Sequence, residues 1–461
     1  MNSLKQLQDR GQSIWLDYIR RDLLTSGEFQ RLVEQDGVHG VTSNPTIFDK
    51  AITAGTAYDD ALRLLLLTDP DRDAQTLFES LEIQDLQMAA DILRPVYDQT
   101  EGADGFVSIE VSPRLAYDTA GSIAEAQRLW KAVNRPNLMV KIPSTVPGVQ
   151  AVEALIAEGI NINITLMFSL AHYETVAQAY LRGLKRNAKP HQVSSVASFF
   201  VSRVDTEVDR ALEGIGTPEA LSLHGKIAIA NAKVVYQRFR EIFLGTAFEE
   251  FRRRGARLQR PLWASTGTKN PAFSDVLYVE ELIGPHTINT IPPATLNAFR
   301  DHGRVQPTLE NGQQDAEQVL ARLAKLDVDL EAITEKLLTD GITAFTHSLD
   351  DLLASLKEKR SSLLEDQATR KGESRASRAA GSDFGRTLRL AARETQARGS
   401  EAAGGAGRDG RASPLAYAHE WFAAAGGDRR RAPDLPAASQ ESGGGHRGGR
   451  AKRSPPPSVR R

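Results

Sequence analysis

The chain has 461 residues, no cysteine and a formal charge of −2 at pH 7. The lack of cysteine excludes disulfides, thiolate metal ligands and cysteine nucleophiles. The net charge conceals an asymmetry, because residues 366–461 carry 19 Lys and Arg against 10 Asp and Glu, whereas residues 1–365 carry 38 against 49. No run of about eighteen apolar residues could cross a membrane, and the polar N-terminus lacks the apolar stretch of a signal peptide. We therefore expect a soluble, cytoplasmic protein. Its residues 1–365 are acidic overall.

Eight short β-type runs alternate with longer helical stretches between residues 13 and 293. The candidate strands are residues 13–19, 40–45, 105–111, 138–143, 162–168, 194–202, 261–266 and 286–292. Alternation without hairpin turns predicts parallel strands joined by right-handed crossovers. Eight repeats within this length favour an α/β fold of the closed (β/α)₈ TIM barrel type over an open doubly wound sheet. No Gly-x-Gly-x-x-Gly turn follows the first strand, so a dinucleotide-binding fold loses its main support.

Two connections are too long for simple crossovers. Residues 46–104 and 206–258 each predict two or more helices, so extra helices should decorate the barrel. Residues 309–363 predict further helices after the eighth strand, which we expect to lie across the barrel. The first domain is accordingly predicted to span residues 1–365.

The remaining segment, residues 366–461, has a different composition. It contains 17 Arg, 20 Ala and 15 Gly but only five Leu or Val and no Ile. So little apolar area cannot offset the conformational entropy of nearly a hundred residues, and the composition predicts a disordered tail. Because Arg, Ala, Gly and Pro have GC-rich codons, the abrupt change near residue 366 also fits a shifted reading frame that replaced a fused domain.

The active site of a TIM barrel lies at the C-terminal ends of its strands. The polar residues that the predicted strands bring there are Asp17, Asn44, Glu110, Lys141, Asn163, Thr165, Ser198, Arg203, Ser265 and Lys269. They include no histidine cluster that could bind a metal and no Ser/His/Asp set. His172, His191 and His224 are expected on helix surfaces, and His286 at the opposite end of the barrel.

Lys141 interrupts the apolar run "LMVKIP" of the fourth strand. A lysine among apolar neighbours has its charged form disfavoured, and a neutral amine can attack a ketone to form a Schiff base. The iminium is an electron sink, and a nearby carboxylate can move protons. This combination cleaves and forms carbon–carbon bonds beside a carbonyl without a metal.

Several stretches in the order of the chain resemble the signatures of the transaldolase family. They are "GVTSNPTIF", "VSIEVSPRLAYDT", "LMVKIPSTVPGVQAVEALIAEGININITLMFS", "SVASFFVSRVD" and, as in the longer bacterial and plant form, "ASTGTKNP". The resemblance covers about residues 1–365. It implies a (β/α)₈ barrel of the class I aldolase type that needs no metal and no cofactor.

The resemblance also implies roles for four catalytic residues. Lys141 matches the Schiff-base lysine, and Asp17 matches the acid/base that handles the substrate hydroxyl proton during C–C cleavage. Glu110 matches the carboxylate that works through a water during Schiff-base formation and hydrolysis. Thr165 helps to hold that water.

Six further residues are implied to bind substrate. Asn44 and Asn163 match the amides that contact the dihydroxyacetone unit, and Ser198 lies beside it. Arg203 matches a phosphate-binding arginine. The strand-seven segment contributes Ser265 and Lys269, where Lys269 stands in for an arginine of the shorter form.

Each residue also has a purely structural interpretation. A lysine at a strand end can extend its amine to solvent, Asp17 can cap a helix, and Glu110 can join two strands by a salt bridge. Asn44 precedes Pro45, a common turn device.

Further residues have similar alternatives. Asn163 can satisfy barrel groups, Thr165 and Ser198 can fill barrel layers, and Arg203 can pair with Asp205 or Asp209.

The sequence thus predicts a transferase of the non-oxidative pentose phosphate pathway. It would move a dihydroxyacetone unit from sedoheptulose 7-phosphate or fructose 6-phosphate to glyceraldehyde 3-phosphate or erythrose 4-phosphate. One alternative is a Schiff-base aldolase that releases free dihydroxyacetone. A second is polyanion or RNA binding, through the Arg/Gly tail only. We expect sugar phosphates as partners, no membrane, and a monomer or homodimer.

Overall fold

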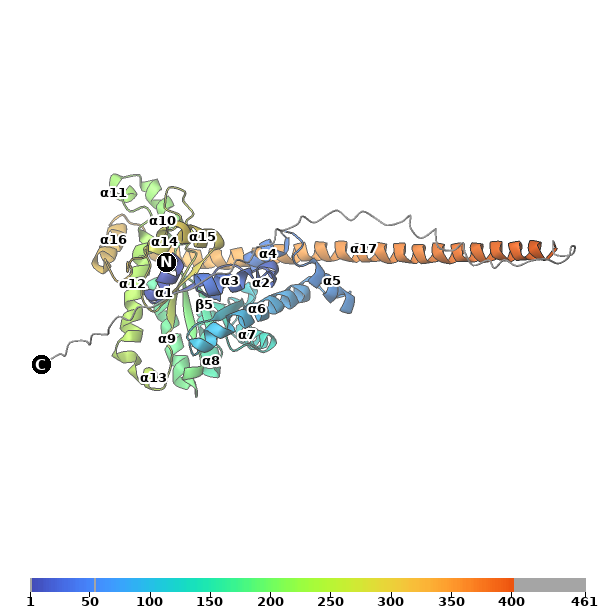
Figure 1. Ribbon diagram of the computed structural model, residues 1–461. Helices are drawn as coiled ribbons and strands as arrows, with labels where there is room; N and C mark the ends of the chain where they lie inside the picture. Colours follow the sequence, from blue (N-terminus) through green and yellow to red (C-terminus); the bar gives the residue numbers. More distant parts are fainter. Residues whose placement is uncertain (1, 54, 402–461) are drawn as a thin grey trace, which may run out of the picture. The chain divides into compact units, whose positions relative to one another are not determined.

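The computed structural model describes residues 2–53 and 55–401. Eight parallel strands close into a barrel in chain order, from β1 to β8 (Figure 1). The strands are β1 (Gln12–Leu16), β2 (Val38–Val41), β3 (Phe106–Glu110), β4 (Leu138–Pro143), β5 (Ile162–Met167), β6 (Ser195–Phe200), β7 (Arg260–Ala264) and β8 (Thr287–Ile291). The predicted (β/α)₈ barrel is confirmed, and each predicted strand matches one of these.

Helices surround the barrel (Figure 1). α1 (Ser3–Asp9) precedes the barrel. Between β1 and β4 the connections contain α2 (Arg21–Thr25) and α3 (Glu28–Arg31) after β1, α4 (Pro45–Thr53), α5 (Asp59–Thr68) and α6 (Ala74–Gln99) after β2, and α7 (Thr119–Val133) after β3. Between β4 and β8 they contain α8 (Val146–Glu158) after β4, α9 (Leu170–Arg186) after β5, α10 (Ser202–Ile215), α11 (Pro218–Leu221), α12 (Ile227–Phe239) and α13 (Glu249–Arg253) after β6, and α14 (Leu277–Glu280) after β7. After β8 come α15 (Pro293–His302), α16 (Gln313–Lys325) and α17 (Leu330–Glu401). The extra helices expected within residues 46–104 and 206–258 are α4 to α6 and α10 to α13.

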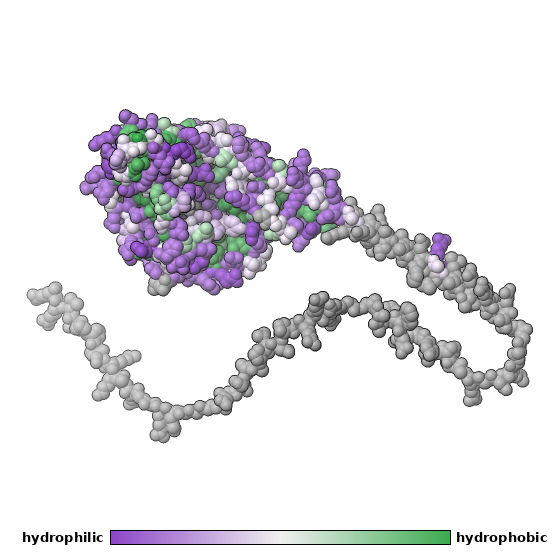
Figure 2. All heavy atoms as spheres, turned by 90° about the horizontal axis from the view of Figure 1, so that it is seen from above, coloured by the Kyte–Doolittle hydropathy of each residue, from purple (hydrophilic) through white to green (hydrophobic). Residues whose placement is uncertain are grey.

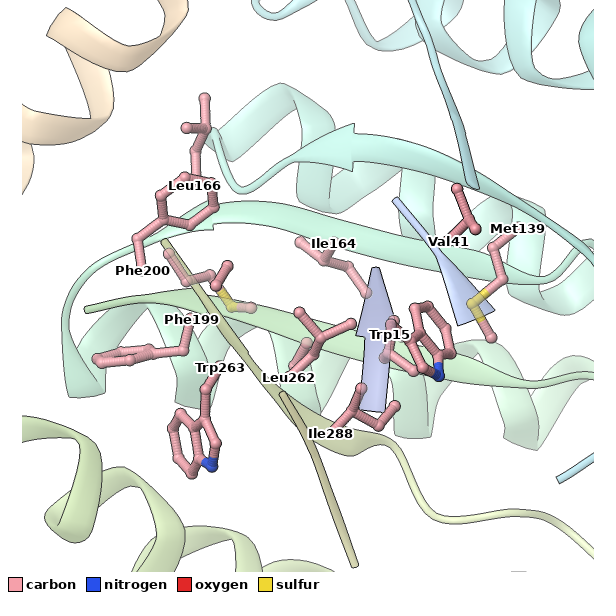
Figure 3. Packing of buried hydrophobic residues seen from close by; sticks show 14 of the residues in the cluster. Trp15, Val41, Met139, Ile164, Leu166, Phe199, Phe200, Leu262, Trp263 and Ile288 are labelled. Atoms are coloured by element: carbon pink, nitrogen blue, oxygen red, sulfur yellow. The ribbon is translucent and has the colours of Figure 1, made fainter. Parts of the chain in front are cut away.

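The strands are apolar on both faces because helices cover the outside and side chains fill the inside. Every residue of β4, β5 and β6 is buried. Figure 3 shows part of this packing, in which Trp15, Met139, Leu262 and Ile288 reach the core from four different strands. Such burial leaves the polar groups at the strand ends as the only route to chemistry inside the barrel.

Trp15 also explains a glycine in the neighbouring strand. Trp15 pairs with Gly40 across the β1–β2 ladder, and a Cβ atom at Gly40 would overlap the indole ring. The large interior side chain on β1 therefore requires the smallest residue on β2.

The C-terminal helix α17 begins as part of the barrel domain. Its buried side chains between residues 337 and 363 belong to the core, and Met1–Ser377 forms one structural unit. The chain differs from the predicted disorder because residues 366–401 continue this helix. The segment contains no proline, and the alanine and arginine in which it is rich are strong helix formers. The rest of the predicted tail, residues 402–461, lies outside the described residues.

The surface of the barrel domain is mainly polar. On the face drawn in Figure 2, hydrophilic residues predominate and hydrophobic ones occur in small separate groups. Within the described residues, no helix is both long and apolar enough to span a bilayer.

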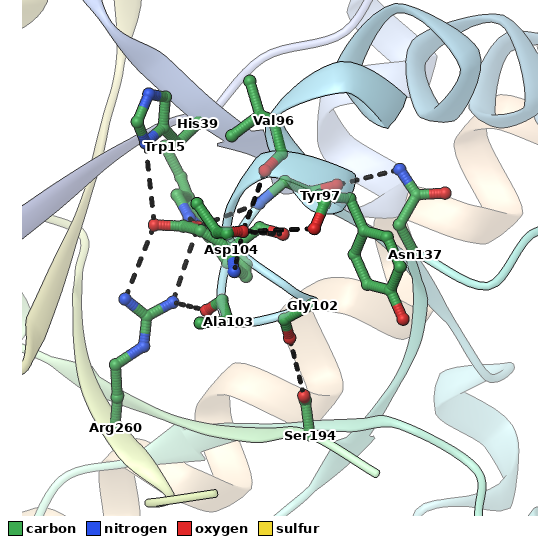
Figure 4. A network of polar contacts seen from close by, with 12 residues as sticks. Trp15, His39, Val96, Tyr97, Gly102, Ala103, Asp104, Asn137, Ser194 and Arg260 are labelled. Atoms are coloured by element: carbon green, nitrogen blue, oxygen red, sulfur yellow. Dashed lines mark hydrogen bonds and ion pairs between the residues drawn. The ribbon is translucent and has the colours of Figure 1, made fainter. Parts of the chain in front are cut away.

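A buried carboxylate ties together the N-terminal ends of several strands (Figure 4). Asp104 lies just before β3, accepts a hydrogen bond from the Trp15 indole at 2.9 Å, and pairs with Arg260 at 3.4 Å and His39 at 3.8 Å. Burial alone would raise the pKa of Asp104, but Arg260 and His39 outweigh it and hold this pKa well below its usual range. The carboxylate therefore stays ionised and fixes the end of the barrel opposite the predicted active site.

We predict that Asp104→Asn lowers the free energy of unfolding by about 3 kcal/mol at pH 7, since removing one partner leaves buried charges unpaired. Urea unfolding followed by tryptophan fluorescence measures this. Asp91→Asn, which breaks an exposed pair with Arg135, is the control and should cost less than about 1 kcal/mol. Because the folded pKa is depressed, the contribution of Asp104 is complete above the unfolded pKa of about 4 and disappears only as the pH falls through the folded value. Equal losses in the two variants would contradict this assignment.

Candidate active site

Strand register places the central lysine between two predicted site residues. Lys141 on β4 pairs with Glu110 on β3 and with Asn163 on β5. All three therefore lie at one level of the barrel. Lys141 itself is 4% exposed, so its amine does not extend to solvent.

Three groups contact the Lys141 amine. Nζ donates to Glu110 Oε2 at 3.1 Å and to the Ser43 carbonyl oxygen at 3.2 Å. It also lies 5.7 Å from the ring centre of Phe345 on α17. The Lys141 and Glu110 side chains are each only 5% exposed. The amine is thus held in a fixed direction and shielded by an aromatic ring.

A cavity of about 240 Å³ opens beside this amine. Eight of the ten predicted site residues border it, namely Asp17, Asn44, Lys141, Thr165, Ser198, Arg203, Ser265 and Lys269. Glu110 and Asn163 do not border it. Asn163 is fully buried, and Glu110 borders a different, smaller cavity.

Asp17 follows β1 directly and is oriented by a hydroxyl. Thr42 Oγ1 donates to Asp17 Oδ1 at 2.9 Å and contacts Thr290 Oγ1 at 2.7 Å. Burial raises the pKa of Asp17, and nearby Lys141 opposes this rise. A carboxyl with a raised pKa can both accept and return a proton during a reaction.

Glu110 is the second carboxyl beside the amine. Burial raises the pKa of Glu110, again against the opposing charge of Lys141, and the Asp17 charge adds to the rise. Two carboxyls with raised pKa values therefore flank one amine from different strands, which is a typical arrangement for proton transfer.

Small polar groups line the wall beyond Lys141. Ser198 Oγ donates to Asn163 Oδ1 at 2.6 Å, and Asn163 Nδ2 donates to Ser108 Oγ at 3.1 Å. Asn163 therefore satisfies barrel groups, as its structural interpretation held. The buried Thr165 hydroxyl, in contrast, has no hydrogen-bond partner in the described part of the chain, which leaves it available to a water or a ligand.

Asn44 combines a structural contact with a place in the cavity. Its Oδ1 accepts from the Ile47 backbone N–H at 3.0 Å, at the start of α4. This bond uses the oxygen and leaves the amide nitrogen for a ligand.

The far end of the cavity gathers cations. Arg203 in the first turn of α10, Lys269 in the loop after β7, and Lys50 on α4 all border it, and across residues 2–53 and 55–401 none of them forms an ion pair. Burial lowers the pKa of Arg203. Burial, followed by repulsion from Arg203, lowers that of Lys269. Unpaired cations that repel one another indicate a site for an anion.

Ser265 stands between these cations in a strained conformation. Its φ angle of 55° is left-handed, and its side chain contacts Ser202 Oγ at 3.0 Å. Non-glycine residues in this region cost energy and concentrate at functional sites. Here the conformation links the end of β7 to the N-terminus of α10, which carries Arg203.

Sequence reasoning missed three features of this site. Lys50 is separated from Asn44 by less than two helical turns, and that spacing could have placed it near the mouth. Thr42 lies two residues before Asn44 on the same strand end. Phe345 had no such signal, because only the fold brings α17 over β4.

His172 differs from its predicted surface position. The residue is 8% exposed, and its Nε2 lies 2.8 Å from Glu335 on α17. In the described ranges, no group of three or more His, Asp or Glu could hold a metal ion.

Comparison with known proteins identifies the constellation. A model of the family described as Transaldolase/Fructose-6-phosphate aldolase matches residues 14–356. The chain belongs to this family. It is 49% identical over 360 residues to the transaldolase of Thiobacillus denitrificans, a match that covers 77% of this chain and all of that protein. It is 47% identical over 355 residues to the transaldolase of Thermobifida fusca, covering 76% and 96%.

A more distant relative agrees. Transaldolase 2 of a Nostoc species is 42% identical over 374 residues, covering 78% of this chain and 98% of that protein. The resemblance seen in the motifs is therefore confirmed, and the chain is an enzyme of the transferase class.

The cation end of the transaldolase site generates a prediction. Arg203→Leu should weaken binding of inorganic phosphate about tenfold or more, because a charge-assisted hydrogen bond contributes about 1.5–3 kcal/mol. Isothermal titration calorimetry at low ionic strength measures the affinity. Arg210→Leu, on the same helix but paired with Glu207 on its exposed face, is the matched control. An unchanged affinity in Arg203→Leu would contradict the anion site.

Proposed function

We propose that Lys141 is the Schiff-base nucleophile of this transaldolase, with Asp17, Glu110 and Thr165 as its catalytic partners. A single observation carries this assignment. The Lys141 amine is buried between two carboxyls and borders a cavity whose other end holds three unpaired cations. A ketose phosphate carries both matching groups, a carbonyl for the amine and a phosphate for the cations.

The reaction begins with the donor, sedoheptulose 7-phosphate or fructose 6-phosphate. Its phosphate pairs with Arg203 and Lys269, and its first three carbons lie near Asn44 and Ser198. Lys141 gives a proton to Glu110, 3.1 Å away, and its neutral nitrogen attacks the C2 carbonyl. The resulting carbinolamine then loses water to form the iminium.

Bond cleavage follows from the electron sink. Asp17 takes the C4 hydroxyl proton, the C3–C4 bond breaks, and its electron pair moves toward the iminium nitrogen. The aldose phosphate leaves, and the three-carbon unit remains on Lys141 as an enamine. Glyceraldehyde 3-phosphate or erythrose 4-phosphate then binds at the same cations, and the steps run in reverse to form the new ketose. Ping-pong kinetics are expected.

The aldolase alternative differs only in the fate of the enamine. An aldolase hydrolyses it and releases dihydroxyacetone, whereas a transferase keeps water away until an acceptor arrives. The Phe345 ring is 4% exposed and covers the Lys141 amine. This apolar cover favours transfer, because excluding water protects a reactive intermediate.

Other predictions remain as they stand. We keep the expectations that the enzyme is cytoplasmic, that it is a monomer or homodimer, and that a catalytic domain ends near residue 365. Binding of RNA or another polyanion by the Arg/Gly tail stays a hypothesis, and most of that tail lies outside the described residues.

Borohydride trapping tests the nucleophile. With fructose 6-phosphate, the wild type should gain the mass of a reduced three-carbon adduct, and Lys141→Ala should gain none. Intact-mass spectrometry followed by peptide mapping measures this. Lys269→Ala is the control, since it removes another amine that borders the cavity and should still form the adduct at saturating donor. An adduct on any residue other than Lys141 would refute the assignment.

Removing the aromatic cover tests the choice between transfer and hydrolysis. Phe345→Ala should raise the ratio of dihydroxyacetone release to transfer about tenfold, because water reaches the enamine. Phe345→Leu keeps an apolar side chain over the amine and should resemble the wild type. A coupled assay with and without acceptor aldehyde gives the ratio. If Phe345→Ala leaves this ratio unchanged, the ring does not exclude water.

A further inference from the structure

A second, small cavity borders Glu110, the ion-pair partner of Lys141. It has a volume of about 30 Å³, enough for one water molecule. Glu110 and Glu82 both line it, and Glu82 comes from the long helix α6 outside the barrel. Since Glu110 does not border the substrate cavity, this small cavity, called the chamber below, is the one that its carboxyl lines.

Glu82 is an unusual residue for such a position. It is 7% exposed, and no hydrogen bond or ion pair to it occurs among residues 2–53 and 55–401. Buried carboxyls without a partner are rare because desolvation of the charge is costly. A neutral, protonated Glu82 avoids this cost.

The charges around Glu82 reinforce the protonated form. Those that face it are all carboxylates, from Glu110 on β3, from Glu79 and Asp85 on α6, and from Glu125 on α7. Burial first, and these neighbours second, raise the pKa of Glu82 well above its ordinary value.

Each neighbouring carboxylate pairs with a cation, whereas Glu82 pairs with none in the described part of the chain. Lys141 pairs with Glu110 and Arg21 with Asp85. Arg128 pairs with both Glu79 and Glu125.

The chamber also leads outward. Gln75, which is exposed, and the partly exposed Glu79 line it together with the buried pair Glu82 and Glu110. The route from solvent to the catalytic carboxyl therefore passes between helices of the outer ring. It does not use the substrate mouth, which a bound sugar phosphate and Phe345 close.

We propose that Glu82 and the one-water chamber form a proton path that recharges Glu110 during Schiff-base formation and hydrolysis. The proposal rests on the proposed function and deepens it. When the carbinolamine dehydrates, the nitrogen lone pair forms the C=N bond and the C–O bond breaks. The leaving hydroxyl takes a proton from Glu110 and departs as water.

The carbonyl oxygen needs two protons to leave as water. One is the proton that Lys141 gave to Glu110, and Glu82 lends the second through the chamber water and Glu110. Before the C=N bond forms, the nitrogen loses one of its two protons, and this proton returns through Glu110 to Glu82. Hydrolysis runs the same transfers in reverse. Glu82 touches no substrate atom, so it is a positioning and proton-supplying residue that acts through Glu110.

Glu82→Gln is the decisive variant because the amide keeps the shape but carries no exchangeable acid proton. After rapid mixing with fructose 6-phosphate, samples quenched with borohydride at set times report adduct formation by mass. We expect about tenfold slower formation in Glu82→Gln, with the final amount of adduct and the KM unchanged, and an altered pH dependence of the rate. Leu129→Phe, which fills the chamber and leaves Glu82 in place, should slow the step similarly. Glu82→Asp should recover part of the rate.

Asp98→Asn is the control, since Asp98 is on the same helix and pairs only with Arg94 on the surface. It should match the wild type. The proposal would be overturned if Glu82→Gln showed the wild-type rate and an unchanged pH profile. It would also be overturned if the variant were slower only because it had lost thermal stability, with its pH profile unchanged. If the wild type itself forms no adduct, the proposed function fails instead, so the two failures are distinguishable.

Discussion

The active site depends on one buried ion pair, Lys141 with Glu110, whose side chains are each 5% exposed. Burying two charges costs several kcal/mol per ion before their attraction is counted. Adjacent strands hold both residues in register, so the backbone already places the two side chains next to each other. In the proposed mechanism one proton moves from Lys141 to Glu110, which removes both buried charges and leaves the amine able to attack the substrate.

The same reasoning applies at the opposite end of the substrate cavity. Arg203 lies close enough to disfavour the charge of Lys269, which the Asp17 carboxylate offsets only in part, and neither cation forms an ion pair within the described part of the chain. This arrangement costs free energy, because Ser265 has a strained backbone conformation and Arg203 is desolvated. The network around Asp104 stabilises the other end of the barrel. Stability and catalysis are thus assigned to opposite ends of the same strands, as is usual for this fold.

Much of this could be predicted from the sequence, for a physical reason. Parallel strands buried on both faces leave clear apolar runs, and a charge such as Lys141 within one of them stands out. Asp17 and Glu110 could be placed because they follow such runs directly. The features that the sequence did not predict depend on contacts between segments that are distant in sequence. The surroundings of Phe345 and His172 are determined by where α17 packs, and no local sequence pattern encodes this packing.

The amino-acid composition predicted disorder after residue 365, whereas residues 366–401 continue α17. The segment's few apolar residues predict that it has no core of its own, and Leu363 is the last residue of α17 whose side chain is described as buried. Helix formation, however, needs only local hydrogen bonds and favourable propensities once a helix has been nucleated. The packed first half of α17 supplies the nucleus, so residues up to Glu401 continue it. Low hydrophobicity therefore excludes a packed domain here but not a helix.

The position of Glu110 gives the site its division of labour. Asp17 borders the substrate cavity, where the C4 hydroxyl must lie, and Glu110 borders a separate chamber. Cleavage needs a base on the substrate side and no free water, since water would capture the enamine. Schiff-base formation and hydrolysis, in contrast, must exchange water and protons. Because Asp17 and Glu110 border different cavities, the proposed mechanism can separate cleavage at Asp17 from the exchange of protons at Glu110.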